Sequence, residues 1–274
     1  RLGRRRVSIL VSPARLPEGA RLLDVRWELG GPHGRPDYLA GHIPGAVFVD
    51  LDAELASHDR PGEGRHPLPV LADLQAAARR WGVRAGETVV VYDGGTGLAA
   101  ARAWWTLRWG GLEDVRILDG GLPAWEGDLE TGDVTPEPGD VVLQGGGMPV
   151  LDAGGAAALA REGLLLDARA PERFRGEVEP MDPVAGHIPG ATSAPATANL
   201  APDGTYLPAE ELRARYEALG VRDGVAVGAY CGSGISAVQD IVALRLAGYD
   251  AVLYPGSWSA WCSDPARPVA TGRS

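Results

Sequence analysis

One cysteine of the chain stands in a loop whose composition suits nucleophilic chemistry. In the segment AYCGSGISAVQD, an apolar run ends at Tyr230, Cys231 follows it, and a helical pattern begins at Ser236. The two glycines of the loop allow positive φ angles and a tight curl. Such a curl aims backbone N–H groups and the positive end of the helix dipole inward, which favours a thiolate at Cys231. The loop residues expected to bind a substrate are Gly232, Gly234, Ile235 and Ser236.

The same cradle would stabilise a persulfide, Cys–S–S⁻, because its outer sulfur carries the charge. The alternative for a lone free cysteine is a small buried hydrophobe, which is the commoner role of this residue type. The glycine-rich loop favours the reactive role for Cys231. Cys262 follows Trp261 without any glycine cradle, and we expect it to be structural.

The elements that position this loop occur twice. The hexapeptide GHIPGA stands at residues 41–46 and again at residues 186–191. Apolar runs ending in an acid and an arginine precede the two copies (RLLDVR and LLLDAR), and tryptophan-ended segments follow them (LDGGLPAW and YPGSWSAW). Such ordered landmarks indicate a tandem duplication. Asp93, in YDGGTG, stands where the second half has Cys231, and a carboxylate cannot accept a sulfane sulfur, so we expect one active site per chain.

Apolar strand runs alternate with helical patterns in each half. Residues 164–167 and 225–230 are predicted strands, and residues 208–219 and 236–247 are predicted helices that end before Gly220 and Gly248. This order predicts an α/β fold of two tandem domains, each with a central, mostly parallel sheet flanked by helices. We expect a non-catalytic domain over residues 1–139, with a Gly- and Pro-rich linker at about 127–149, and a catalytic domain over residues 140–274.

Composition excludes several classes of partner. The formal net charge of −10 disfavours nucleic acid and anionic membranes, and the basic run RLGRRR at residues 1–6 is expected to be a solvated tail. No apolar run reaches the roughly 18 residues of a membrane span, and no signal peptide is visible. Two cysteines are too few for a disulfide framework or a structural zinc site. We therefore expect a cytoplasmic enzyme without a metal or organic cofactor.

The duplicated GHIPGA segments, the cysteine loop of one half and the C-terminal PGSWSAW segment resemble the rhodanese superfamily over nearly the whole chain. The resemblance implies two rhodanese-like domains and a ping-pong sulfurtransferase, in which Cys231 takes sulfur from a small anionic donor and passes it to a thiol or cyanide. The sequence CGSGI resembles the CG[ST]GV loop of 3-mercaptopyruvate sulfurtransferases. Enzymes that prefer thiosulfate typically carry basic residues after the cysteine, and this loop has none. The favoured donor is therefore 3-mercaptopyruvate, with thiosulfate as the alternative.

The resemblance also assigns roles outside the loop. Arg173, in DARAPERFRGE, matches the substrate-binding arginine of the family, although a solvated surface arginine is the alternative. Ser233, His66 in GRHPLP and Asp52 in VDLDAEL match a serine–histidine–aspartate proton relay, against the alternative of a loop histidine and a surface acid. Met181 stands where mercaptopyruvate enzymes usually carry a second arginine, and this departure keeps thiosulfate open as the donor.

A further set of polar residues recurs in both halves and is predicted to be structural. An acid and an arginine follow the first landmark strand of each half, and one histidine stands in each GHIPGA segment. Because one half lacks a nucleophile, ion pairs and backbone hydrogen bonds are favoured over catalysis for these residues. They are Asp24, Arg26, His42, Asp167, Arg169 and His187.

Two other functional classes remain to be weighed. A cysteine-based phosphatase needs an arginine six residues after its nucleophile, and Ala237 stands at that position, so this class is excluded. A non-enzymatic rhodanese module, acting as a scaffold or redox sensor, predicts no reactive thiolate at Cys231. Alkylation of Cys231 compared with Cys262 separates that class from an enzyme.

Overall fold

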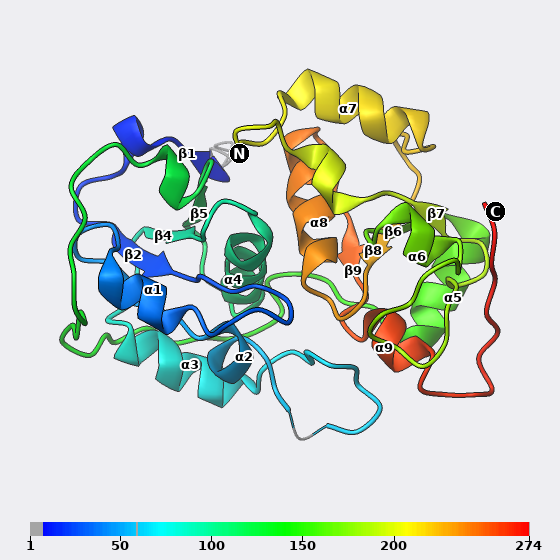
Figure 1. Ribbon diagram of the computed structural model, residues 1–274, viewed down its shortest axis with the longest axis horizontal. Helices are drawn as coiled ribbons and strands as arrows, with labels where there is room; N and C mark the ends of the chain where they lie inside the picture. Colours follow the sequence, from blue (N-terminus) through cyan, green and yellow to red (C-terminus); the bar gives the residue numbers. More distant parts are fainter. Residues whose placement is uncertain (1–7, 59, 274) are drawn as a thin grey trace, which may run out of the picture. The chain divides into compact units, whose positions relative to one another are not determined.

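The computed structural model describes residues 8–58 and 60–273, and the basic cluster at residues 1–6 lies outside them (Figure 1). The chain divides into two compact units. Unit 1 holds the described residues up to Glu54 together with Val70–Gly147, and unit 2 holds the described residues of Leu55–Pro69 and of Met148–Ser274. A short segment from the first half of the chain therefore belongs to the second unit. The change between units falls within the predicted linker, and the domain limits 1–139 and 140–274 stay a prediction.

Unit 1 is built on a five-stranded parallel sheet with the strand order β1-β5-β4-β2-β3. Parallel strands need crossover connections, and helices between the strands supply most of them. The strands are β1 (Leu10–Val11), β2 (Arg21–Asp24), β3 (Val47–Phe48), β4 (Val89–Tyr92) and β5 (Val115–Leu118). The α-helices are α1 (Arg35–Ala40), α2 (Leu51–Glu54), α3 (Leu71–Arg80) and α4 (Leu98–Trp109), with 3₁₀ turns η1 (Pro13–Arg15) and η2 (Leu122–Ala124).

Unit 2 repeats this plan with a four-stranded parallel sheet in the order β7-β6-β8-β9. Figure 1 shows α5 and α8 on opposite sides of β6 and β8. The strands are β6 (Leu164–Asp167), β7 (Thr192–Ser193), β8 (Val227–Tyr230) and β9 (Val252–Leu253). The helices are α5 (Ala153–Glu162), α6 (Pro171–Phe174), α7 (Ala209–Ala218), α8 (Ser236–Leu246) and α9 (Ser257–Trp261), with the 3₁₀ turn η3 (Ala196–Asn199).

The sequence predicts the elements around the cysteine closely. The first predicted strand of unit 2 coincides with β6, and the second begins two residues before β8. All four residues of β8 are buried, as expected for an inner strand of a parallel sheet. Gly220 and Gly248 follow α7 and α8 with φ angles of +105° and +92°, which confirms their role as helix stops.

The repeated ion pairs are structural, as predicted. In unit 2, Arg169 Nη2 donates to Asp167 at 2.7 Å and to the Gly186 carbonyl at 2.6 Å. Burial lowers the pKa of Arg169, but the attraction of Asp167 outweighs it, so the pKa of the arginine is raised. In unit 1, Arg26 pairs with Asp24 at the same 2.7 Å. The pairs tie the end of a strand to the GHIPGA segment in each unit.

The two GHIPGA histidines are structural as well. The Nδ1 atom of His42 bonds to the carbonyl oxygen of Tyr38 at 2.9 Å, and that of His187 bonds to the carbonyl oxygen of Phe174 at 2.7 Å. Each imidazole stacks on the ring of the same partner, with centroid distances of 4.1 Å and 3.7 Å. Burial lowers the pKa of His187, which keeps its ring neutral.

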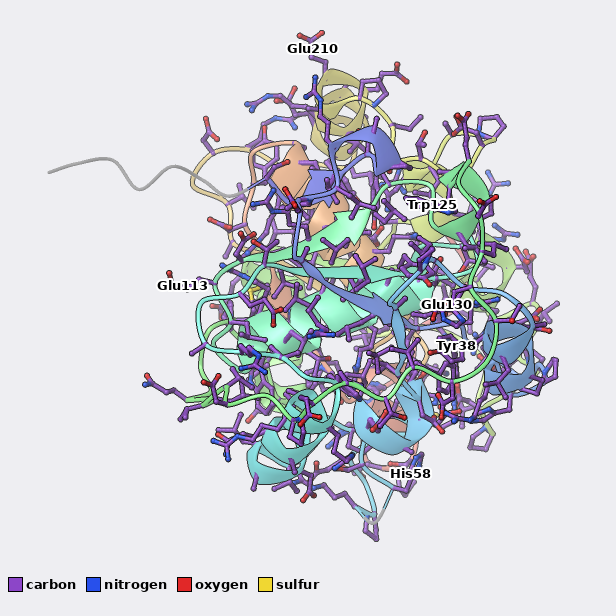
Figure 2. All side chains as sticks on the ribbon, turned by 90° about the vertical axis from the view of Figure 1, so that its left-hand side faces the viewer. Tyr38, His58, Glu113, Trp125, Glu130 and Glu210 are labelled. Atoms are coloured by element: carbon purple, nitrogen blue, oxygen red, sulfur yellow. The ribbon has the colours of Figure 1, made fainter. Side chains whose placement is uncertain are left out.

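Much of the segment predicted as a linker packs along unit 1. Glu130 and His42 exchange backbone hydrogen bonds of 2.9 Å, and the Val134 N–H donates to the Tyr38 hydroxyl at 3.1 Å. Figure 2 shows Glu130 and Tyr38 on the same side of this unit. Further along, the Gly139 N–H donates at 2.7 Å to a carbonyl near the end of α3. Backbone hydrogen bonds hold this segment against unit 1, although its Gly- and Pro-rich composition predicts a linker.

None of the helices in the described part of the chain is long and apolar enough to cross a bilayer.

Candidate active site

Cys231 lies at the carboxyl end of β8 and is only 1% exposed. The loop after it curls back, since Gly234 adopts a φ of +81°, and the Gly234 N–H donates to Cys231 Sγ at 3.1 Å. An N–H aimed at sulfur stabilises negative charge on it. Ile235 is buried at the N-cap of α8, and Ser236 is the first residue of that helix. The loop therefore leads from the strand directly into a helix N-terminus, as the sequence predicts.

The two loop glycines serve different purposes, and this corrects one expectation. Positive φ was expected at both, but only Gly234 adopts it. At Gly232 an ideal Cβ atom would lie 3.0 Å from Arg65 Nη2 and 3.5 Å from Arg173 Nη1, so the ends of two guanidinium groups lie beside this position of the cysteine loop.

The matching loop of unit 1 shows what its backbone binds. The Asp93 carboxylate accepts the N–H groups of Gly95 at 2.8 Å, Gly97 at 3.1 Å and Ala100 at 3.1 Å. Burial raises the pKa of Asp93, and these hydrogen bonds oppose that rise. The unit 1 loop thus encloses an acidic group of its own chain where unit 2 carries Cys231. The unit 2 positions that match the three donors are Ser233, Ile235 and Val238.

The first residues of α9 support the cysteine loop through hydrogen bonds. The Cys231 N–H donates to Ser257 Oγ at 3.1 Å. In return, Trp258 N–H donates to the Cys231 carbonyl and Ser259 N–H to the Gly232 carbonyl, both at 2.9 Å. Ser257 reaches this position with a φ of +54°, which is rare for a residue other than glycine. The sequence marks PGSWSAW only as a landmark of the repeat, so its supporting role was missed.

His66 and Ser233 are brought together within unit 2. His66 belongs to the segment Leu55–Pro69, and its Nδ1 atom lies 2.8 Å from Ser233 Oγ. Both side chains are buried. Asp52 lies on α2 of unit 1, where both of its carboxylate oxygens lie 3.0 Å from Trp27 Nε1. The serine–histidine part of the predicted relay therefore rests on a direct contact, while the contribution of Asp52 stays a prediction.

Arg173 lies on α6 among acidic partners. Its Nη2 atom lies 2.7 Å from Glu179 Oε1 and 3.4 Å from Asp182 Oδ2. The other oxygen of Asp182 pairs with Arg65 Nη1. Burial raises the pKa of Asp182, and Arg65 opposes that rise. The Met181 side chain is 43% exposed.

Sequence reasoning missed Arg65, Glu179 and Asp182. The pair of Arg65 with Asp182 spans 117 residues, a separation that no local pattern reports. The one available signal was the position of Arg65 directly before His66.

The described residues outside this loop were also compared with the requirements of a metal site and of a second reactive thiol. No group of three or more His, Cys, Asp or Glu side chains there has a geometry that would hold a metal ion. Cys231 and Cys262 are both free thiols. Burial raises the pKa of Cys262, which keeps that thiol protonated.

Fold and site together define a class of protein: two α/β units, in which one unit presents a buried cysteine in a glycine loop and the other encloses an aspartate at the same place. Comparison with known proteins agrees with this class. Residues 14–128 and 153–264 both match the rhodanese-like domain family. The chain therefore belongs to the rhodanese family, and it is a sulfurtransferase.

Relatives match the chain over nearly its whole length. SseB of Mycobacterium tuberculosis, named as a thiosulfate sulfurtransferase, is 52% identical over 259 residues, covering 92% of this chain and 90% of its own. A Pseudomonas aeruginosa protein named as a 3-mercaptopyruvate sulfurtransferase is 50% identical over 270 residues, covering 94% and 95%. The crystal structure of SseA from Escherichia coli, a 3-mercaptopyruvate sulfotransferase, matches with a TM-score of 0.82 at 33% identity, covering 92% of this chain and all of that one. The predicted fold class is confirmed, and the scaffold or sensor alternative is set aside.

Proposed function

We propose that Cys231 carries the sulfur, taking it from a small anionic donor, with 3-mercaptopyruvate favoured, and passing it to a thiol or cyanide. The observation that carries this proposal is the Gly234 N–H, which lies 3.1 Å from Cys231 Sγ. The loop of unit 1 supports it by comparison, since three other backbone N–H groups of that loop, at the positions that match Ser233, Ile235 and Val238, bind the carboxylate of Asp93. A persulfide on Cys231 would place its charged outer sulfur among such donors.

In the first half-reaction, the Cys231 thiolate attacks the sulfur of 3-mercaptopyruvate. An S–S bond forms, the C–S bond breaks, and pyruvate leaves as its enolate. The proton of the donor thiol ends on the enolate carbon, which yields pyruvate and leaves Cys–S–S⁻ on the enzyme. Protons and charge balance without any oxidant or cofactor.

Ser233 and His66 are positioned to move that proton. The contact of 2.8 Å between Ser233 Oγ and His66 Nδ1 is short enough for direct transfer. In this scheme the serine hydroxyl passes a proton toward the enolate and His66 accepts or supplies it. Asp52 is proposed to orient the histidine as the third member of the relay.

In the second half-reaction, the acceptor attacks the outer sulfur of the persulfide. Cyanide leaves as thiocyanate, and a thiol R–SH leaves as the persulfide R–S–SH. Either transfer breaks the S–S bond and restores the Cys231 thiolate. The two half-reactions give ping-pong kinetics.

Thiosulfate is the second candidate donor, favoured by Met181, which offers no cation to a keto acid. The names of the relatives support each donor at nearly equal identity, 52% for thiosulfate and 50% for 3-mercaptopyruvate. The loop sequence CGSGI contains no basic residue, which favours 3-mercaptopyruvate. Thiosulfate would react by the same attack, with sulfite leaving and no proton transferred.

We place this reaction in the cytoplasm and expect no nucleic-acid or membrane partner. A cysteine that cycles between thiolate and persulfide needs a compartment that keeps thiols reduced, and both cysteines are free. The net charge of −10 also disfavours polyanionic surfaces.

Steady-state turnover with each donor, on the wild type and on Cys231→Ala, tests the proposal. We expect Cys231→Ala to lose turnover with both donors, and 3-mercaptopyruvate to give the higher kcat/KM in the wild type. Turnover that survives in Cys231→Ala would remove Cys231 as the carrier. A higher kcat/KM with thiosulfate would establish the second candidate donor instead.

A further inference from the structure

A series of ion pairs leads from the end of β6 to the loop of Cys231. Three acids and three arginines pair in turn along it, in the order Asp167, Arg169, Glu179, Arg173, Asp182 and Arg65. The six charges cancel, so the series as a whole carries no net charge. Each acid in it therefore removes one positive charge that an anionic donor would otherwise meet beside the cysteine loop.

We infer that Asp182 is a specificity-determining residue, whose carboxylate selects against sulfur donors that carry two negative charges. This inference rests on the proposed function, because it concerns the choice between the two donors of the same site. 3-Mercaptopyruvate brings one negative charge in its carboxylate, whereas thiosulfate is a dianion. A fixed carboxylate repels the dianion about twice as strongly, since the Coulomb energy is proportional to the charge of the donor.

The Asp182 carboxylate and the cysteine loop lie against the same arginine. Asp182 Oδ2 lies 3.4 Å from Arg173 Nη2, and that nitrogen lies 3.6 Å from the ideal Cβ position of Gly232. Gly232 directly follows Cys231 in the chain. Arg173 is the predicted substrate-binding arginine, so an anion that binds it beside the loop also comes under the negative charge of Asp182.

Hydrogen bonds and burial fix the position of Asp182. The N–H groups of Met181 and Asp182 both donate to Glu179 Oε1 at 3.1 Å, which closes a tight turn. The second carboxylate oxygen of Asp182 pairs with Arg65 Nη1. The Asp182 side chain is only 5% exposed, and solvent screens a buried charge much less than an exposed one. The carboxylate therefore keeps its repulsion toward an incoming anion.

Met181 and Asp182 are neighbours that act in opposite directions on the choice of donor. Met181 offers no cation to a keto acid, which weakens the binding of 3-mercaptopyruvate. Asp182 adds a negative charge one residue further on, which weakens the binding of thiosulfate more strongly. The segment before the second GHIPGA therefore lowers the affinity for both donors, and the charge at Asp182 sets the ratio between them.

The test compares two inert anions of similar shape and different charge. Sulfate carries two negative charges and methanesulfonate carries one, and either anion protects Cys231 from iodoacetamide when it binds beside the loop. Alkylation is followed by mass spectrometry of the Cys231 peptide at about pH 7 and constant ionic strength, and half protection gives an apparent Kd. In Asp182→Asn we expect this Kd to fall by about threefold for methanesulfonate and about tenfold for sulfate, because the lost repulsion counts twice for the dianion.

Glu177→Gln is the matched control, because it removes the same charge from the same segment, where Glu177 pairs with Arg175 at the surface. Both constants should equal those of the wild type. Asp182→Glu keeps the charge and should keep the wild-type ratio of the two constants. Asp182→Ser removes the charge with a smaller side chain and replaces Asp182→Asn if that variant does not fold. Equal changes for the two anions, or no protection by either one, would overturn the inference.

Turnover separates this inference from the proposed function. In Asp182→Asn, kcat/KM for thiosulfate should rise by about threefold relative to that for 3-mercaptopyruvate, mainly through KM, since binding is what the charge opposes. A wild type that turns over neither donor defeats the proposed function, and the protection constants still decide on Asp182. A higher KM for both donors in Asp182→Asn, in an enzyme that depends on Cys231, would assign Asp182 the role of holding the arginines in place and defeat the inference alone.

Discussion

At the scale of single residues, the two cysteines differ in what surrounds their sulfur atoms. Cys231 receives a backbone N–H on Sγ, whereas burial raises the pKa of Cys262. Both are largely shielded from solvent, at 1% and 8% exposed. Exposure therefore does not distinguish the proposed nucleophile, Cys231, from Cys262, whereas the N–H donor on Sγ does.

The pair of Ser233 and His66 should distinguish the two donors. Release of pyruvate needs a proton at carbon, whereas release of sulfite does not. We expect Ser233→Ala to lower kcat with 3-mercaptopyruvate by about a hundredfold, in the range of general acid–base catalysis. Turnover of thiosulfate should change much less. Equal losses with both donors in steady-state assays would instead assign Ser233 a role in shaping the loop.

Much of this site could be predicted at the residue scale, and the missing part has a physical reason. The repeat and the glycine loop identify Cys231, and the motif positions of Ser233 and His66 anticipate their contact. Arg65 and Asp182 could not be predicted, because their pair joins segments 117 residues apart. Such a contact depends on how the chain folds back, which hydrophobic periodicity does not encode.

At the scale of elements, strand β8, the loop after it and helix α8 together position Cys231. The sequence predicts this strand–loop–helix unit because a buried parallel strand, a glycine turn and a helix each have a strong local signal. The strands β3, β7 and β9 are only two residues long, and they exist through pairing with their neighbours. Local patterns are too short to report them.

Gly234→Ala tests the loop, because alanine disfavours the φ of +81° that this position requires. We expect the free energy of unfolding to fall by about 1–2 kcal/mol. We also expect turnover to fall by about tenfold, since the N–H on Sγ moves with the backbone. Urea unfolding and steady-state assays measure the two effects.

Gly224→Ala is the matched control for strain alone. Gly224 has a φ of +83° in the same unit, and no atom lies within 4 Å of its ideal Cβ position. The control should lose similar stability and keep full turnover. A Gly234→Ala enzyme as active as this control would show that the N–H contact to sulfur is dispensable.

At the scale of the whole molecule, the duplicated units differ at one matching position, where unit 2 carries Cys231, the proposed nucleophile, and unit 1 carries Asp93. A buried acid inside unit 2, Asp240, links the stability of the protein to pH. Asp240 on α8 accepts hydrogen bonds from Asn199 at 2.7 Å and from Tyr216 at 3.0 Å. Burial raises the pKa of Asp240 from 3.8 to about 7. Between about pH 4 and pH 7 the folded chain therefore holds a proton there that the unfolded chain has lost.

The free energy of unfolding should consequently fall as pH rises from about 4 to about 7, because the unfolded state binds fewer protons in that range. This group contributes a decrease of about 2–4 kcal/mol, and no further change above pH 7. Asp240→Asn removes the titration. Urea unfolding of both proteins at a series of pH values gives a difference curve, and a flat difference between pH 4 and 7 would contradict the raised pKa.

The most direct measurement of the central claim is the mass of the Cys231 peptide after the enzyme meets a donor without an acceptor. Excess 3-mercaptopyruvate is added, the protein is blocked and digested, and the peptides of Cys231 and Cys262 are weighed. The account predicts that the Cys231 peptide gains the mass of one sulfur atom and loses it again when cyanide is added. An unchanged Cys231 peptide alongside measurable turnover, or sulfur carried by Cys262 instead, would contradict it.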